Sequence, residues 1–341
     1  MPVLTESALS EKIKNDPGGA FILYGAESYL VKVYTEKLMR ATVDKDLEEF
    51  NLRVFDGENT ELSSVYDEVT AFSFTGGRKC VVVRDYPVDD ANDADFKNIE
   101  MILQDNPEEN CLIFSYTSLA PAKKMKDLLK LFDKYGYKVE FGAKQDSDIV
   151  RILENGAKKR GKTFEKGVAF NMLNMVGSNL NLLLNELEKL CAYSGDTITN
   201  TDVEAVCTKS LEASVFEMTD FILTGKIDSA LSILADLFAK RESEVMILSA
   251  LISKYVDMYR AKVMRGENIP YDSLGDYYKD YKGKSAYRLK KSGESAQRFS
   301  LAHIKTCLDI LAGADLALKS TSADGRTVLE TTLVKLWKAG A

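Results

Sequence analysis

The feature that most constrains the fold is a strand, a glycine and a helix in direct succession near the amino terminus. Residues 21–38 read FILYGAESYLVKVYTEKL, with an apolar run at Phe21–Tyr24, then Gly25, then apolar residues at helical spacing. A buried strand that turns at a glycine into a helix is the setting of a phosphate-binding loop, because N–H groups at a helix N-terminus bind anions. The unit therefore predicts an α/β domain of the nucleotide-binding kind.

The loop itself lacks the residues that bind phosphate. The pattern G-x-x-x-x-G-K-[ST] can start at Gly25, but Leu30 replaces its second glycine and Val31 replaces its lysine. A phosphate site needs small residues and an ammonium group. Lys32 is one residue late, which rotates its side chain by roughly 100° around the helix. We expect no nucleotide cofactor here, and we expect Leu30 and Val31 to pack instead.

The acidic pair that ends a strand and holds Mg²⁺ is missing as well. The apolar run Cys111–Phe114 ends in Ser115 and Tyr116. Neutral hydroxyl groups are poor ligands for Mg²⁺, which is bound through carboxylates. The missing acidic pair argues against nucleotide binding only if Cys111–Phe114 is the strand that would carry it. The defect in the loop that begins at Gly25 does not depend on that assignment.

No residue is singled out for catalysis or for metal binding. The only histidine, His303, lies off the apolar stripe of its expected helix, so we interpret it as solvated. Serine–histidine triads and histidine-rich metal sites need a histidine in the right place. No acidic pair lies in an apolar setting. We expect no intrinsic catalysis, no metal and no other cofactor.

Bulk composition indicates a protein with two or three domains. The chain has 341 residues, 45% hydrophobic and 28% charged, with a net charge of −7, so tight free-standing nucleic-acid binding is not expected. The cysteines are scattered without a C-x-x-C pair, and neither a signal peptide nor an apolar run of membrane-spanning length is found. We expect a cytoplasmic location without membrane contact. The five cysteines are Cys80, Cys111, Cys191, Cys207 and Cys307.

Strand patterns alternate with helical ones up to Phe141, and the pattern is helical from Asp146 onward. Alternating elements with continuous apolar strands predict a parallel sheet covered on both faces. We expect an α/β domain at residues 1–142, a small helical domain at 143–209 and a larger helical domain at 210–341. The expected strands are Phe21–Tyr24, Phe50–Phe55, Cys80–Arg84, Leu112–Tyr116 and Lys138–Phe141, and the helices between them are Tyr29–Met39, Glu61–Phe72 and Lys123–Phe132.

Two aromatic residues lie near the end of the expected helix Glu61–Phe72, before the expected strand Cys80–Arg84. Phe72 continues the apolar stripe of Glu61–Phe72, which predicts a core position, and Phe74 follows just before Gly76 and Gly77. Spacing alone favours Phe74 packing back onto the sheet. The alternative is an exposed anchor that fills a pocket of a partner, as interface hot spots do.

Two basic clusters are candidates for weak phosphate contact. Helix ends favour lysines, which explains the first cluster without any ligand. The second is longer and lies among tyrosines, so weak, nonspecific contact with phosphate is an alternative there, although neither cluster is a specific signal. The residues we assign to possible DNA contact are Lys158, Lys159, Arg160, Lys284 and Arg288.

Taken in order, these segments resemble one family along nearly the whole chain. The chain is similar to the delta-subunit family of the bacterial DNA polymerase III clamp loader. Each motif is modest alone, and their order and spacing are specific. The motifs are FILYGAESYL at 21–30, VFDGEN at 54–59, RKCVVVRD at 78–85, VGSNLNLLLNELEKLCAYSG at 176–195, ITNTDVEAV at 198–206, SVFEMTDFILTGKIDSAL at 214–231 and ADLALKS at 314–320.

The resemblance implies an AAA+ (RecA-like) domain that binds no ATP, a small helical lid domain and a helical collar domain. The implied function is that of a subunit of a pentameric ATPase assembly in the bacterial cytoplasm, at the nucleoid during replication. The implied partners are the sliding clamp (the beta subunit), the ATPase and delta-prime subunits through the collar, and primed DNA. By binding the open clamp better than the closed one, such a subunit shifts the clamp toward opening.

The family's clamp-binding element is a pair of adjacent apolar residues before the RKCVVV-type strand. Counting back from Arg78 places this pair on Phe74 and Thr75, with Phe72 as a further candidate, and the resemblance makes Phe74 the anchor. Thr75 departs from the pattern, because a buried hydroxyl without a partner costs free energy where an apolar side chain gains it.

Two other functions compete with this one. An ATP-hydrolysing AAA+ helicase loader or remodelling factor would have the same architecture, but Leu30 and Val31 argue against it. A scaffold that keeps an AAA+ body for other partners is the third possibility, and binding to the clamp separates it from the first.

Overall fold

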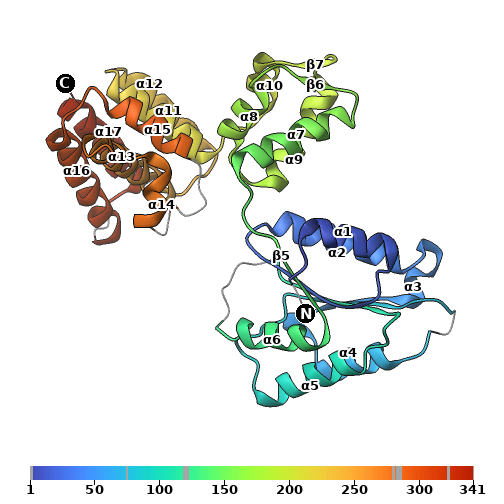
Figure 1. Ribbon diagram of the computed structural model, residues 1–341. Helices are drawn as coiled ribbons and strands as arrows, with labels where there is room; N and C mark the ends of the chain where they lie inside the picture. Colours follow the sequence, from blue (N-terminus) through green and yellow to red (C-terminus); the bar gives the residue numbers. More distant parts are fainter. Residues whose placement is uncertain are drawn as a thin grey trace. The chain divides into compact units, whose positions relative to one another are not determined.

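The computed structural model describes residues 3–73, 76–117, 123–278, 281, 286–320 and 323–340 (Figure 1). The chain divides into two compact units, Met1–Lys144 and Gln145–Ala341. The first contains a five-stranded sheet with helices, and the second is mainly helical. The further division that we predict at residues 209 and 210 stays a prediction.

A parallel sheet forms the centre of the first unit, with the strand order β2-β3-β4-β1-β5. Every neighbouring pair is parallel, so the carboxyl ends of all strands meet at one edge. This confirms the predicted parallel α/β architecture, and the predicted strands deviate by at most two residues at either end. The strands are β1 (Gly19–Tyr24), β2 (Leu52–Asp56), β3 (Cys80–Arg84), β4 (Cys111–Ser115) and β5 (Tyr137–Glu140).

Helices cover both faces of this sheet, α1 and α2 on one face and α4, α5 and α6 on the other (Figure 1). Because successive side chains of a strand point to opposite faces, Phe21 and Leu23 join the core under α1 and α2, while Ala20 and Ile22 join the opposite core. The helices are α1 (Glu6–Asn15), α2 (Ser28–Thr42), the single-turn α3 (Glu48–Asn51), α4 (Leu62–Thr70), α5 (Asp93–Gln104) and α6 (Met125–Tyr135).

Helices α1 and α5 were not predicted from the sequence. Both begin with recognisable caps. The Thr5 side chain accepts a hydrogen bond from the Ala8 backbone N–H at 3.2 Å, and Asn92 and Asp95 form a reciprocal capping box at the start of α5. Such caps satisfy N–H groups that lack an intrahelical partner. They are the signals that the sequence offered for these helices.

The second unit is helical, as predicted, with one exception. Strands β6 (Thr163–Phe164) and β7 (Thr197–Ile198) form a small parallel sheet, so the expectation that strands stop near Phe141 was wrong. Two-residue strands are too short to carry a period. The helices are α7 (Asp146–Lys158), α8 (Val168–Val176), α9 (Leu180–Tyr193), α10 (Asn200–Val206), α11 (Leu211–Leu223), α12 (Ile227–Ala239), α13 (Glu244–Gly266), α14 (Leu274–Tyr277), α15 (Ala286–Ala296), α16 (Leu301–Ser320) and α17 (Gly325–Gly340).

The largest apolar core of the second unit joins α11, α12, α13, α16 and α17, with Val215, Met218, Leu251, Ile304 and Leu333 fully or almost fully buried. A smaller core joins α13, α14 and α15 around Met264, Leu274 and Leu289. Among the described residues, no helix combines the length and the apolar character that crossing a bilayer requires.

Candidate functional site

The glycine at the end of β1 is required by the next strand rather than by a phosphate. Gly25 has a φ of +131°, and a Cβ there would lie 2.4 Å from the carbonyl oxygen of Phe141. The Phe141 backbone donates a hydrogen bond to the Tyr24 carbonyl at 2.7 Å and accepts one from the Glu27 N–H at 3.0 Å. The chain that leaves β5 therefore lies directly against this turn.

Leu30 and Val31 belong to the core under α1 and α2. Their relative exposures are 7% and 0%, and they pack in the same cluster as Leu9 and Phe21. Lys32 is exposed. The two positions that would complete a phosphate loop therefore contribute to packing, as the sequence predicts.

A carboxylate lies at the start of α2, where a phosphate-binding helix would present free N–H groups. Glu27 occupies the N-cap position. Partial burial raises the pKa of its carboxyl group, and a hydrogen bond from the Tyr29 backbone and the charge of Lys144 oppose that rise. A helix N-terminus stabilises an anion through its dipole, and this side chain already supplies one. The sequence reading missed this residue.

An acidic residue follows β3, the strand beside β4, which corrects the prediction that was based on Cys111–Phe114 alone. The strand order places β3 beside β4, and Asp85 follows the end of β3. Its carboxylate accepts hydrogen bonds from the Thr117 backbone N–H at 2.7 Å and from the Thr117 hydroxyl at 2.8 Å. An acid therefore follows the strand next to β4, and the case against nucleotide binding rests on the residues from Gly25 to Lys32.

The segment between α4 and β3 exposes an aromatic side chain. Helix α4 ends at Thr70, two residues before the predicted end, and Phe72 is 92% exposed. The prediction that Phe72 continues the helix and joins the core was therefore wrong. Phe74 and Thr75 lie outside the described residues, and Ser73 and Gly76 flank them.

A buried asparagine connects the two flanks of this segment. Asn51, at the end of α3, is 2% exposed. Its side-chain oxygen accepts a hydrogen bond from the Ser73 hydroxyl at 2.9 Å, and its side-chain nitrogen donates to the Gly76 carbonyl at 3.0 Å. Both polar ends of a buried amide are thereby satisfied. The sequence reading missed Asn51, because this contact spans more than twenty residues.

The carboxyl-terminal end of the same segment is fixed by two cations. Lys79, which is 4% exposed, pairs with the Glu68 carboxylate and donates to the carbonyl oxygens of Glu68 at 2.7 Å and Ala71 at 3.3 Å, at the end of α4. Arg78 binds Asp16 at 2.6 Å and holds the pKa of that carboxyl down, to about 2. We call residues 71–79, with these supports, the α4–β3 loop.

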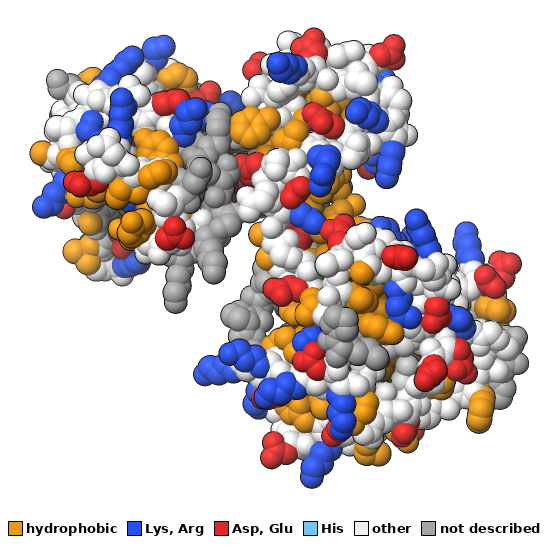
Figure 2. Space-filling view, viewed as in Figure 1, with side chains coloured by type: hydrophobic (Ala, Val, Ile, Leu, Met, Phe, Trp, Pro, Cys, Tyr) orange, Lys and Arg blue, Asp and Glu red, His pale blue; other side chains and the backbone are white. Residues whose placement is uncertain are grey.

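The basic residues that we assigned to DNA contact lie in the second unit. Lys158, Lys159 and Arg160 are exposed at the end of α7, and Arg160 also donates to the Gly156 carbonyl at 3.1 Å. Lys284 lies outside the described residues, and Arg288 falls within α15. On the face shown in Figure 2, basic and acidic side chains are interspersed.

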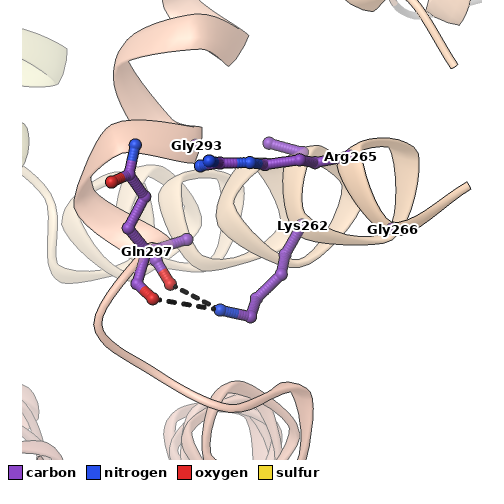
Figure 3. Close-up of a pocket in the computed structure, with 7 residues that line it drawn as sticks. Lys262, Arg265, Gly266, Gly293 and Gln297 are labelled. Carbon is purple, nitrogen blue, oxygen red and sulfur yellow. Dashed lines mark hydrogen bonds between the residues drawn. The ribbon is translucent and has the colours of Figure 1, made fainter. Parts of the chain in front are cut away.

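A cavity of about 350 Å³ lies between α13 and α15. Lys262 donates there to the carbonyl oxygens of Ala296 at 3.0 Å and Gln297 at 3.3 Å, at the end of α15 (Figure 3). Arg265 extends from α13 toward Gly293 in the same view. The Lys262 ammonium therefore caps the carboxyl-terminal end of α15.

The described residues contain no group of three potential metal ligands of the His, Cys, Asp or Glu type. His303 stacks on Phe299 with ring centroids 4.8 Å apart, and its Nε2 lies 3.6 Å from the Cys307 sulfur. Burial raises the pKa of the Cys307 thiol to about 11, so this thiol stays protonated. The pair is a packing contact on α16 and not a reactive dyad.

Family models match the chain along most of its length. Residues 21–141 match the model of the DNA polymerase III delta subunit, and residues 212–336 match the model of the C-terminal domain of that subunit. Residues 145–205 match a model described as a middle domain. The chain belongs to the DNA polymerase III delta-subunit family.

Individual relatives agree with this family. The DNA polymerase III subunit delta of Bacillus subtilis is 25% identical over 332 residues, covering 95% of this chain and 94% of the relative. A probable delta subunit of Aquifex aeolicus is 24% identical over 265 residues, covering 73% of each chain. The solved structure of the Bacillus subtilis DNA clamp loader delta protein shares the fold, with 24% identity, 97% and 98% coverage and a TM-score of 0.59.

Proposed function

We propose that this delta-family chain binds the sliding clamp through the α4–β3 loop and helps to open the clamp within a pentameric clamp loader. The observation that carries the proposal is an exposed aromatic side chain in this loop, whose two ends are held by hydrogen bonds. Phe72 is 92% exposed, on a segment fixed by the buried side chains of Asn51 and Lys79. Exposed aromatic residues on a rigid support are the usual form of an interface hot spot.

Clamp opening needs no chemistry in this subunit. A protein that binds the open ring more tightly than the closed ring shifts the equilibrium by its difference in affinity. With Leu30 and Val31 in the core and Glu27 at the start of α2, we propose that ATP binding and hydrolysis belong to other subunits. This chain would be non-catalytic.

The experiment that tests this function is a titration of the purified sliding clamp into the purified chain, followed by calorimetry and by co-elution in gel filtration. The expected result is saturable binding that does not require ATP. Absence of binding in both measurements would contradict the proposal and would leave a scaffold with other partners as the better reading.

We further propose that the C-terminal helices form the collar that holds the ATPase and delta-prime subunits. Several large apolar side chains of this region are solvent-exposed in the isolated chain, including Leu316 at 65%, Val245 at 55% and Met246 at 54%. Apolar side chains that stay exposed in one chain are available for contact with another. Primed DNA would be contacted weakly by Lys158, Lys159 and Arg160, and by Lys284 and Arg288.

The collar proposal predicts a selective defect. Replacing Leu316 by Asp should weaken assembly with the ATPase subunits by about tenfold or more, because it places a charge in an apolar contact. Clamp binding should be unchanged. The matched control is Leu182→Asp on α9, where a leucine with 52% exposure receives the same substitution. Equal assembly of wild type and Leu316→Asp in analytical gel filtration would rule out this part of the collar.

A further inference from the structure

The single-turn helix α3 holds a second exposed phenylalanine beside the α4–β3 loop. Phe50 is 57% exposed, although its neighbour Asn51 is 2% exposed. A single exposed aromatic residue is ordinary on a protein surface, whereas several that gather at one place mark an interaction site. Phe50 and Phe72 can belong to one interaction site only if they lie close together.

The hydrogen bond between Asn51 and Ser73 limits the distance between Phe50 and Phe72. Asn51 accepts from Ser73 at 2.9 Å, and Phe50 and Phe72 are the residues immediately before these two. Since consecutive Cα atoms are about 3.8 Å apart, the Cα atoms of Phe50 and Phe72 lie within about 16 Å of each other. That span is within the width of one protein–protein contact area.

The surroundings of Phe50 favour contact over packing within the chain. Strand β2, which follows α3 directly, is the outer strand of the sheet, and its Val54 is 43% exposed. The Arg53 guanidinium donates to the Glu49 carbonyl at 3.0 Å and lies 3.6 Å from the Glu68 carboxylate. These contacts connect α3 and β2 to α4, so Phe50 is presented from a supported position.

The geometry points to Phe50 as a second apolar anchor of the clamp-docking surface, one that compensates for the polar Thr75 in the loop. This inference rests on the proposed clamp binding and adds a residue to it. The occupant is the sliding clamp, because Phe50 directly precedes Asn51, whose side chain is hydrogen-bonded to both flanks of the loop that we propose to bind the clamp. A large apolar side chain on α3 would supply the contact area that a threonine in the loop does not.

The test is the clamp affinity of the full chain with Phe50→Ala, measured by surface plasmon resonance. We expect about tenfold weaker binding, mainly through faster dissociation. Phe50→Leu keeps the apolar contact and should bind within about threefold of wild type. The matched control is Tyr193→Ala on α9, an aromatic residue with 63% exposure, which should not change the affinity.

The outcomes separate this inference from the proposed function. If wild type binds the clamp and Phe50→Ala binds equally well, the second anchor is wrong and the proposed function stands. If Phe50→Leu is as weak as Phe50→Ala, aromatic shape rather than apolar contact is required, which contradicts the inference as stated. If wild type does not bind the clamp, both proposals fail. Equal melting temperatures of all variants would show that the differences are not caused by unfolding.

Discussion

Replacing Phe74 by Ala is expected to abolish measurable clamp binding while the chain stays folded. We propose Phe74 as the anchor of a clamp-binding element, and Asn51 is hydrogen-bonded to Ser73 and Gly76 on either side of it. Truncating a central aromatic hot spot costs about 2–4 kcal/mol or more, so we expect binding to weaken by about thirtyfold to a thousandfold. Surface plasmon resonance against immobilised clamp measures this loss.

Two companion variants make the result specific. Phe72→Ala should weaken binding by about tenfold, because Phe72 is exposed beside the anchor. Thr75→Leu should strengthen binding, because the apolar side chain removes the cost of burying a hydroxyl. Unchanged affinity of Phe74→Ala would contradict the assignment of the anchor, and an intact circular dichroism spectrum would show that the fold survives.

Restoring the phosphate-loop lysine is expected to unfold the first unit rather than to create an ATP site. Val31 is fully buried among the residues under α1 and α2. The variant Val31→Lys places an ammonium group in this core without a partner, which should lower the free energy of unfolding by about 4 kcal/mol or more. The denaturant midpoint of the full chain measures this change.

The neighbouring lysine provides the control. Lys32 is exposed on the same helix, so Lys32→Ala should change the stability by less than about 0.5 kcal/mol. A fluorescent ATP analogue should bind neither variant. A Val31→Lys chain that is as stable as wild type and binds the analogue would show that the phosphate corner is intact and that our view of Leu30 and Val31 is wrong.

The parallel sheet could be predicted because its signals are local. Buried strands read as continuous apolar runs, and β3 was predicted with its observed bounds. The sequence also carried the defect at Leu30 and Val31, since a missing glycine and a missing lysine are visible without a structure. Helices α1 and α5 were missed because their caps were not read, and β6 and β7 are too short for any periodicity.

The candidate site was predicted only in part, for a physical reason. The family resemblance predicted the loop positions, which stay a prediction, whereas the supports of the loop depend on contacts between distant segments. Asn51 reaches Ser73 and Gly76 from α3, and Asp16 reaches Arg78 from the end of α1. The stripe of apolar residues placed Phe72 in the core because a period does not reveal where α4 ends. The Lys79 ammonium donates hydrogen bonds to the Glu68 and Ala71 carbonyl oxygens at the end of α4, where the stripe predicted that the helix continues.

The most direct test of the central claim compares two forms of the clamp. The affinity of the wild-type chain should be measured, by calorimetry without ATP, for the closed clamp ring and for a clamp variant whose subunit interface is broken. A subunit that drives opening by differential affinity must bind the broken form more tightly, and we expect a difference of about tenfold or more. Equal affinities for the two forms would contradict the account, because such a chain could hold the clamp without opening it.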